Sequence, residues 1–437
     1  MVCWSLLLLL LTATLATLSK QTFESATPKG CVTVLDKWCS SEIVRLSCFH
    51  THSSGACANS RVYASLSNAG WICKALDESC SCPDSRDQLN RLFHLCANNL
   101  TAVDVFVSGE SNINTYRIPA IVQTNKETLL AFAEGRVYDS SDCHRKLIVM
   151  KRSTDLGNTW EKLQIIPINL SDEHLVTANP QPVFDHMTNT TLLQFVTNDN
   201  TTHQCNPGNN NGQIISSDDG LTWSQLKSMD NVLGINRGLL PGPGGAIQLT
   251  HTTYAGRLVF CGHYGAYVRD LVWYSDDHGK TFQLSKTQLP EMDEPQVVEL
   301  TNGSLLLNMR NRHKNDCQCR AISRSDDGGM TWGPIHYDPV LISPICQASL
   351  VRINDAFYFS NPASKIAREN LTIRKSTNNC NNWQSELKIV DGPVAGGYSN
   401  IVPLTDSTKG GILYERFDVV NGTKRSVISF TQFPLDF

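Results

Sequence analysis

An eight-residue pattern, Ser-x-Asp-x-Gly-x-Thr-Trp, recurs along this chain and constrains its fold more than any other feature. Four copies begin at Ser153, Ser216, Ser275 and Ser325, the third with Phe in place of Trp, and a degenerate fifth copy begins at Ser376. Their third positions are separated by 63, 59, 50 and 51 residues. A repeat of this period is typical of a propeller, in which each repeat forms one four-stranded sheet.

Each of these boxes has the composition of a tight turn. The Asp carboxylate accepts hydrogen bonds from the backbone of its own turn, and the Gly adopts the positive φ that closes it. The terminal aromatic side chain would then be buried between neighbouring sheets. We therefore interpret the boxes as structural elements of hairpin turns and not as catalytic carboxylates.

The part of the chain that carries the boxes is rich in short strands. From about Val103 onward, β-rich runs alternate with Gly, Asn, Asp and Ser turns, and no long segment has helical periodicity. Such a pattern indicates an all-β sandwich, barrel or propeller, and the repeat period favours the propeller. The clearest runs are 116–122, 128–135, 146–153, 191–198, 257–263 and 304–310.

The first residues have the composition of a secretory signal. Residues 5–18 form an apolar run of 14, whereas a membrane-spanning helix needs about 20. We expect a signal peptide over residues 1–19, with an uncleaved signal anchor as the alternative, and no transmembrane segment later in the chain. Seven glycosylation sequons fit a secretory route: Asn99, Asn169, Asn189, Asn200, Asn302, Asn370 and Asn421.

Half of the 16 cysteines fall between Cys31 and Cys96. Eight cysteines in an oxidising compartment predict four disulfides, whose connectivity the spacing leaves open. Apolar residues at helical spacing over 87–95 indicate some helix. We therefore predict a small disulfide-rich, partly helical N-terminal module over residues 20–100. Cys80 and Cys82 are separated by one residue, which is a weak indication of metal binding, and structural cystine is the preferred interpretation.

Charge and the remaining cysteines exclude other classes of protein. The net charge is −4 over 437 residues and no stretch is strongly basic, which argues against nucleic-acid binding. Seven cysteines follow residue 100, so at least one thiol is expected to be free or unexpectedly paired. No His or Cys set has zinc-ligand spacing, Cys317 and Cys319 included, so we expect no metal and no cofactor.

The boxes resemble the Asp boxes of the sialidases (exo-α-sialidases, neuraminidases). Tyr-Arg-Ile-Pro at 116–119 is similar to the family's Y/F-R-I-P motif, and LLAFAEGR, CGH, NDCQCR, SNPA and ARENLTIR resemble its animal lysosomal members. The resemblance covers about residues 103–437 and leaves out the cysteine-rich module. It implies a six-bladed β-propeller, which we assign to residues 101–437.

This resemblance implies three arginines that bind the sialic acid carboxylate, a role for which the planar guanidinium is suited. The matching positions are Arg117, Arg310 and Arg368, with Arg374 as a rival to Arg368. By the same likeness, Glu415 would pair with Arg117. Arg136 would line the pocket near the acid/base, with Glu134 in the same ion-pair network.

The resemblance also implies a tyrosine nucleophile, because sialidases depart from the usual pair of carboxylates. A carboxylate nucleophile would be repelled by the substrate's own carboxylate. Tyr398 matches that position, and Glu294 matches its base. Asp142 matches the acid/base and is preferred over Asp139. His263 is expected to make a hydrogen bond at a strand end and not to catalyse.

We therefore expect a retaining exo-α-sialidase that hydrolyses terminal sialic acids of glycoproteins, glycolipids and oligosaccharides. Two alternatives remain open: a trans-sialidase, and a propeller that only binds sialoglycans. The end of the chain soon after the last strands favours hydrolysis, since trans-sialidases usually add a C-terminal lectin domain. The presence of Asp142, Glu294 and Tyr398 together argues against a pure binder.

The expected location is the secretory pathway, most simply the lysosomal lumen. The resemblance implies a partner there, a protective serine carboxypeptidase. However, the C-terminal Pro-Leu-Asp-Phe has no tyrosine-based sorting signal, and the cysteine-rich module is an addition to the family pattern. Secretion or attachment to the cell surface is the alternative.

Overall fold

The computed structural model describes two compact units, Met1–Asn99 and Leu100–Phe437. In the first unit only the strand backbones are described. In the second, all residues are described except 169–174, 200–209, 236–237, 252, 266–267, 314–315, 393–394 and 421–422. The predicted signal peptide, the helix over 87–95 and the pairing of the N-terminal cysteines lie outside the described residues. Within the described part, no helix is long and apolar enough to cross a membrane.

The N-terminal unit contains one five-stranded antiparallel sheet, in which the strands follow one another in chain order. Its strands are β1 (Thr22–Ala26), β2 (Cys31–Asp36), β3 (Ile43–His50), β4 (Ser60–Ser67) and β5 (Gly70–Ala75).

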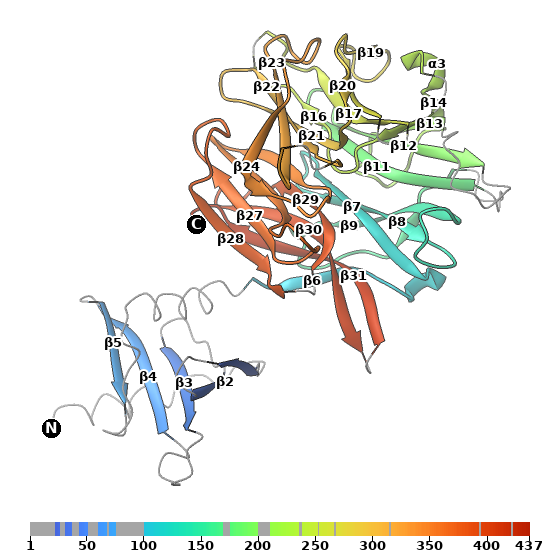
Figure 1. Ribbon diagram of the computed structural model, residues 1–437. Coiled ribbons are helices and arrows are strands. Elements are labelled where there is room, and N and C mark those ends of the chain that lie inside the picture. Colours follow the sequence, from blue (N-terminus) through green and yellow to red (C-terminus); the bar gives the residue numbers. More distant parts are fainter. Residues whose placement is uncertain are drawn as a thin grey trace. The chain divides into compact units, whose positions relative to one another are not determined.

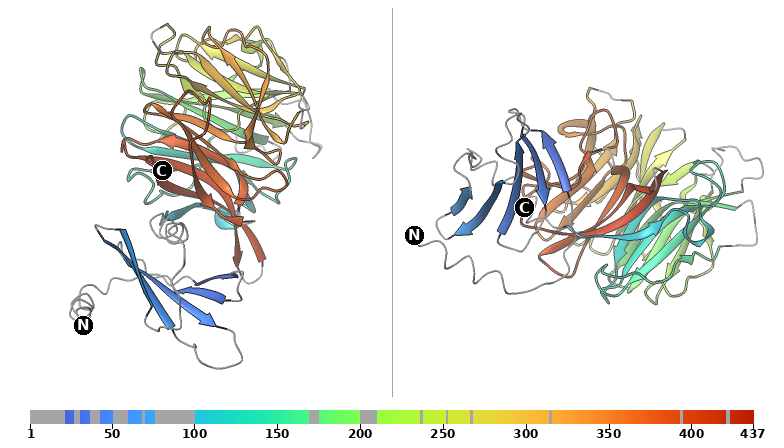
Figure 2. Two further views of the ribbon diagram at one scale, coloured as in Figure 1. Left: turned by 60° about the vertical axis from the view of Figure 1, so that its left-hand side comes forward. Right: turned by 90° about the horizontal axis from the view of Figure 1, so that it is seen from below.

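The second unit is a six-bladed β-propeller, as predicted (Figures 1 and 2). Its first two blades are β7 (Thr115–Gln123), β8 (Leu129–Arg136), β9 (Lys146–Ser153) and β10 (Gln164–Ile165), then β11 (Leu175–Asp185), β12 (Thr190–Asp199), β13 (Asn210–Ser216) and β14 (Lys227–Ser228). The third has β15 (Leu239–Pro241), β16 (Ile247–Gln248), β17 (Leu258–Tyr264), β18 (Arg269–Ser275), β19 (Gln283–Leu284) and β20 (Leu289–Pro290).

The fourth blade is β21 (Asp293–Glu299), β22 (Leu305–Arg310), β23 (Cys319–Ser325) and β24 (His336–Ile342). The fifth is β25 (Ser349–Ile353), β26 (Ala356–Pro362), β27 (Leu371–Ser376) and β28 (Ser385–Val390), and the sixth is β29 (Ala395–Pro403), β30 (Lys409–Val420), β31 (Thr423–Pro434) and β6 (Ala102–Val107). Two short helices complete the described elements: η1 (Glu110–Asn112) and α3 (Asp230–Leu233).

The ring is closed by strands from the two ends of this unit. Strand β6 is the outermost strand of the last blade and pairs antiparallel with β31, with Val107 opposite Val427 and Ala102 opposite Thr431 (Figure 1). Backbone hydrogen bonds therefore join the beginning of the propeller to its end, and the six sheets form a closed ring.

Apolar contacts between adjacent blades form the core. Six buried clusters are each shared by two neighbouring sheets; one contains Phe132 of the first blade and Phe195 of the second, and another contains Val149 of the first and Phe430 of the sixth. Because burial of apolar surface is the main favourable contribution to folding, each blade depends on both of its neighbours.

The boxes are structural turns, as predicted. In the first, between β9 and β10, Asp155 Oδ1 accepts bonds from Ser153 Oγ (2.7 Å) and Thr159 N (2.9 Å), and Gly157 N donates to Ser153 Oγ (2.8 Å). The same bonds occur in the next three boxes. In the degenerate box, Asn378 Oδ1 takes the place of the carboxylate.

The aromatic residue of the box packs against a neighbouring blade in the first two copies. Trp160 contacts Phe430 of the sixth blade edge to face at 5.6 Å, and Trp223 contacts Phe132 of the first blade at 5.9 Å. Each box thus ties a turn of one sheet to the core beside the next sheet. Both indoles remain partly exposed, so their burial is less complete than the sequence predicted.

Replacing Gly157 by alanine tests this coupling. Gly157 has φ +90°, and a Cβ there would lie 2.1 Å from the Phe430 ring, which forces the interface apart. Gly234 has φ +66° with nothing within 4 Å of a Cβ, so Gly234→Ala is a control for backbone strain alone. We expect urea unfolding to show a loss of about 1–2 kcal/mol for Gly234→Ala and about 3 kcal/mol or more for Gly157→Ala. Equal losses would contradict the packing role.

Candidate active site

Three of the expected site residues, Arg117, Glu294 and Tyr398, lie where inner strands are distorted. A break in register that marks a bulge occurs in β7 between Arg117 and Ala120, in β21 between Asp293 and Gln296, and in β29 between Ala395 and Ser399. These bulges contain positive φ values at Ile118 (61°), Glu294 (38°) and Gly397 (126°). A bulge redirects side chains, and this is how strands from three blades direct functional groups into one place.

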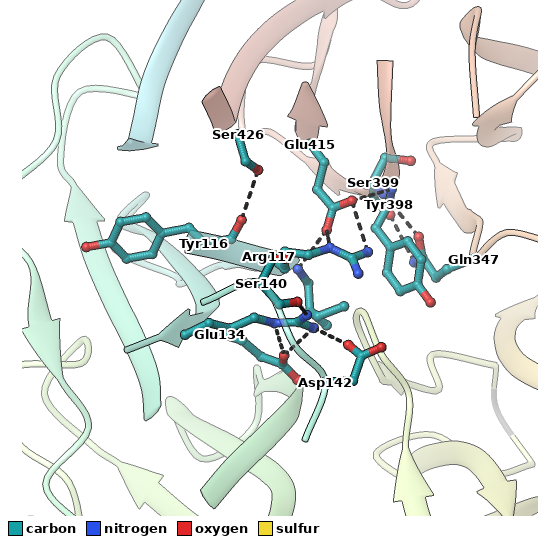
Figure 3. Close-up of polar contacts among 12 residues, drawn as sticks. Tyr116, Arg117, Glu134, Ser140, Asp142, Gln347, Tyr398, Ser399, Glu415 and Ser426 are labelled. Atoms are coloured by element: carbon teal, nitrogen blue, oxygen red, sulfur yellow. Dashed lines mark hydrogen bonds and ion pairs between the residues drawn. The ribbon is translucent and has the colours of Figure 1, made fainter. Parts of the chain in front are cut away.

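Arg117 is held in a fixed plane by Glu415 of β30. Its Nε lies 3.1 Å from Glu415 Oε1 and its Nη2 lies 3.3 Å from Oε2. The same carboxylate accepts bonds from the backbone N–H groups of Ile118 (2.9 Å) and Tyr398 (3.2 Å). Glu415 is buried, so it positions both Arg117 and the backbone of Tyr398 (Figure 3).

Tyr398, Glu294 and Arg310 form a buried hydrogen-bonded triad. The Tyr398 hydroxyl donates to Glu294 Oε1, and Arg310 Nη1 donates to Glu294 Oε2 at 2.5 Å and to Tyr398 Oη at 3.1 Å. Burial and the adjacent Glu294 carboxylate raise the pKa of Tyr398 well above its ordinary value. Burial opposes the charge of Glu294, but Arg310 and the tyrosine hydroxyl outweigh it and lower the pKa of Glu294. The resting triad is therefore a neutral phenol beside a carboxylate.

Two guanidinium groups flank the Tyr398 ring. Arg117 Cζ lies 5.1 Å and Arg368 Cζ 5.3 Å from the ring centroid. Arg368 comes from the loop between β26 and β27 and passes so close to Gly397 that a Cβ there would lie 2.8 Å from its Cδ. Both contacts are within the range of a cation–π interaction, so three arginines surround the hydroxyl-bearing ring.

Asp142 lies at the rim of this cluster, in the loop between β8 and β9. Its Oδ1 is 2.6 Å from Arg136 Nη2; its side chain is 72% exposed, and that of Arg136 is 2% exposed. Arg136 is itself held by Glu134 Oε2 at 2.9 Å and donates to Ser140 O at 2.6 Å. Figure 3 shows Asp142, Arg117 and Tyr398 gathered in one place.

The charges around Asp142 favour its ionised form. Desolvation opposes the carboxylate, but Arg136, Lys146 and Arg117 outweigh it and lower the pKa of Asp142. Asp142 is therefore charged in the free protein. An anion bound beside these cations would offset them, and a proton on Asp142 would then become more favourable.

The structure also distinguishes the rival residues. Asp139 accepts a bond from Ser141 N (2.8 Å) and contacts His144 Nδ1 (2.7 Å), so it orders the loop. Arg374 donates to Asn361 Oδ1 at 3.3 Å, and its Nε lies 3.8 Å from Glu386 Oε2. Asp142 and Arg368 therefore lie beside the cluster, and their roles stay predictions.

Several residues of the site carried no sequence signal of their own. Lys146 Nζ lies 3.6 Å from Glu134 Oε2, and Gln347 exchanges two 3.0 Å bonds with the backbone of Ser399, next to Tyr398. Asp293, next to Glu294, contacts Arg310 Nε at 3.3 Å. Only the adjacency of Asp293 to Glu294 could have pointed to it, because the other contacts depend on how the blades meet.

The described propeller cysteines include free thiols, as their odd number predicted. Cys317 and Cys319 form a disulfide, Cys143 is disulfide-bonded, and Cys261, Cys346 and Cys380 are free and buried. His263 lies near the end of β17, and burial lowers its pKa to about 4. No group of three or more His, Cys, Asp or Glu among the described residues is arranged to hold a metal.

A separate cavity lies along the inner strands. It is farther from the N-terminal ends of these strands than the candidate site is. Its volume is about 560 Å³, and residues of β7, β11, β16, β21, β25 and β29 line it. Its lining begins at Ile121 in β7, Gln296 in β21 and Asn400 in β29, after the bulges that carry the triad and Arg117. The space inside the ring is therefore distinct from the candidate site.

Comparison with known proteins identifies relatives of this chain. Residues 127–414 match the family described as BNR repeat-like domain. The chain is 32% identical over 341 residues to a sialidase of Micromonospora viridifaciens, a match that covers 72% of this chain and 52% of that protein. The chain therefore spans about half the length of this curated relative.

Solved structures share the fold. A Hadza microbial sialidase matches with a TM-score of 0.68 at 23% identity, over 91% of this chain and 74% of that one. An intramolecular trans-sialidase from Ruminococcus gnavus, solved with oseltamivir carboxylate, matches with a TM-score of 0.65 at 18% identity, over 76% and 97%. At these identities the likeness establishes the propeller fold.

Proposed function

This chain belongs to the sialidase family with BNR repeats, and from that premise we propose that it is an exo-α-sialidase. It would hydrolyse terminal sialic acids from glycoproteins, glycolipids and oligosaccharides with retention of configuration. The observation that carries the proposal is the triad: the Tyr398 hydroxyl donates to the Glu294 carboxylate beside Arg310. A buried tyrosine with an adjacent base and flanking cations is suited to attack on an anionic sugar.

Three arginines would bind the substrate carboxylate. Arg117 and Arg368 flank the Tyr398 ring, and Arg310 contacts its hydroxyl. A carboxylate placed among them would lie next to the attacking oxygen, as a sialic acid requires because its carboxylate is bonded to the anomeric carbon. Removing one preorganised hydrogen-bond donor from a site that stabilises developing charge costs about 2.7–4 kcal/mol in a well-studied enzyme.

Catalysis would proceed in two steps. Glu294 takes the phenolic proton as Tyr398 Oη forms a bond to the anomeric carbon, while Asp142 protonates the departing glycan oxygen. Asp142 then takes a proton from water, which attacks the anomeric carbon and displaces Tyr398, and the phenol regains its proton from Glu294. The exposed position of Asp142 at the rim suits a group that meets first the leaving glycan and then water.

The first experiment measures product and stereochemistry. The purified protein is expected to release sialic acid from α-sialyl oligosaccharides at acidic pH, and NMR should detect the α-anomer before mutarotation. Asp142→Ala should lower kcat/KM on these natural substrates about 10²–10⁴-fold. The loss should be under about tenfold on a nitrophenyl α-sialoside, because nitrophenolate departs without protonation.

Asp139→Ala is the matched control, since Asp139 lies in the same loop but contacts His144. Any loss of kcat/KM that Asp139→Ala causes should be equal for the α-sialyl oligosaccharides and the nitrophenyl α-sialoside. If Asp142→Ala lowers kcat/KM by the same factor for both leaving groups, the acid/base role of Asp142 is overturned. An inactive wild-type protein that still binds sialosides would favour a binding propeller.

A trans-sialidase reaction is the second candidate, because a glycosyl-enzyme intermediate on Tyr398 could react with an acceptor sugar in place of water. Formation of a cyclic or transferred sialoside in place of free sialic acid would identify it. Chromatography of the reaction products therefore distinguishes hydrolysis from transfer.

We also propose a location in the secretory pathway, most simply the lysosome, with a serine carboxypeptidase-type protein as a partner. The apolar run over residues 5–18 supports the pathway, as do sequons at the exposed turn residues Asn189 and Asn302. Mass spectrometry of the protein from its native source would detect glycans on both residues. Unmodified peptides at both would argue against this route.

A further inference from the structure

Asp293 lies at the start of β21, fully buried behind the triad. Its Oδ2 is 3.3 Å from Arg310 Nε, and its Oδ1 is 3.4 Å from Nδ1 of His263 in the third blade. Within the described structure, neither oxygen makes a hydrogen bond. An ionised carboxyl group is costly to bury unless it is paired and hydrogen-bonded, and protonation removes most of that cost.

The backbone brings Asp293 and Glu294 to the same guanidinium. Consecutive side chains of a regular strand point to opposite faces of the sheet. Here the positive φ of Glu294 (38°) and the bulge after Asp293 let both carboxyl groups reach Arg310, one at Nε and the other at Nη1. Arg310 is thus hydrogen-bonded to Glu294 on one edge and lies at ion-pair distance from Asp293 on another.

Burial favours the neutral form of Asp293 and outweighs the arginines around it. Burial and Glu294 raise the pKa of Asp293 to about 7, and burial raises the pKa of Asp270 well above its ordinary value. The titratable groups that face Asp293 are Glu294 on its own strand, His263 on β17, Asp270 on β18, Arg310 on β22, Arg312 after β22 and Arg320 on β23. At acidic pH, Arg310 therefore has one anionic partner, Glu294.

We propose that Asp293 is a positioning residue for the attack by Tyr398: as a neutral acid it orients Arg310 without cancelling the charge that Arg310 offers to Glu294 and to the substrate carboxylate. The inference rests on the proposed function. When Asp293 ionises, Arg310 gains a second anionic partner and the site repels the substrate carboxylate. Substrate binding then weakens while the fold is unchanged.

The test compares pH profiles on a fluorogenic α-sialoside. For the wild type, KM should rise about tenfold between pH 6 and pH 8 from this ionisation. Asp293→Asn keeps the shape and cannot ionise, so its KM should rise less than about threefold while its kcat/KM at pH 5 stays within about threefold of the wild type. Asp293→Ala removes the support of Arg310 and should lose more than about tenfold in kcat/KM at pH 5.

Asp185→Asn is the matched control, because Asp185 is equally buried, at the end of β11, and bonds to Gln248 and His278. Its KM should follow the wild-type pH dependence. Identical KM profiles for Asp293→Asn and the wild type, or full activity of Asp293→Ala, would overturn the inference. A wild type that turns over no sialoside would instead overturn the proposed function.

A measurement on the wild type alone guards against variants that do not fold. Calorimetry of a non-hydrolysable sialic acid analogue, repeated in buffers of different ionisation enthalpy, counts the protons taken up on binding. Because the complex favours neutral Asp293, uptake attributable to this group should approach one proton at pH 8. No uptake at pH 8 would contradict the proposal.

Discussion

Replacement of Tyr398 by phenylalanine is expected to lower kcat at least about a thousandfold, which corresponds to about 4 kcal/mol in the activation barrier. The substitution removes one oxygen, the atom that would attack the anomeric carbon, and leaves the ring between Arg117 and Arg368. KM should change little, because the arginines that bind the carboxylate remain. Steady-state kinetics on a fluorogenic α-sialoside measures both quantities.

Tyr414→Phe is the matched control. Tyr414 is buried in β30, and its hydroxyl bonds to Thr431 Oγ1 at 3.2 Å, with no contact to the triad. This variant loses the same atom and should keep kcat within about threefold, with a loss of about 1 kcal/mol in unfolding free energy. Tyr398→Phe with more than a tenth of wild-type kcat would rule out a covalent tyrosine mechanism.

Replacement of Arg310 by lysine is expected to lower kcat/KM about 10²–10³-fold. Lysine keeps the charge but loses the planar fork, so it cannot contact Asp293, Glu294 and a substrate carboxylate at once. The expected loss includes a higher KM from weaker carboxylate binding and a lower kcat from a displaced Glu294. Inhibition by free sialic acid should weaken in parallel, and this measures binding apart from catalysis.

Arg257→Lys provides the comparison. Arg257 is equally buried and pairs with both oxygens of Asp276, at 2.7 and 2.9 Å, near the boxes. It should lose stability without a change in kcat/KM. If Arg310→Lys has the same kcat/KM as the wild type, the planar guanidinium of Arg310 is not needed for catalysis or substrate binding.

Much of the fold was predictable because its signals are local. Ser153, Asp155, Gly157 and Thr159 complete a turn among themselves, so the box is visible in eight residues. Its repetition indicated a ring of similar sheets. The pairing of β6 with β31 carries no such signal, since those strands lie at opposite ends of the propeller and meet only when the ring closes.

The candidate site was partly predictable, through motif likeness. Arg117, Asp142, Glu294, Arg310, Arg368, Tyr398 and Glu415, together with Arg136, all lie in or beside one cluster. Their roles remain predictions that the variants above test. Motifs do not describe bulges or contacts between blades. For this reason they gave no sign of the contacts of Lys146 with Glu134, of Gln347 with Ser399 or of Asp293 with Arg310.

The sequence by itself determined the repeated turn, the all-β class and the chemical types of the site residues, because these depend on neighbours within a few positions. The tertiary structure decided which groups meet. Arg117 and Glu415 are 298 positions apart, and Glu294 and Tyr398 are 104 apart. It also decided which carboxyl groups carry charge. Burial raises the pKa of Asp293, whereas Arg310 and the Tyr398 hydroxyl outweigh burial at the adjacent Glu294 and lower its pKa.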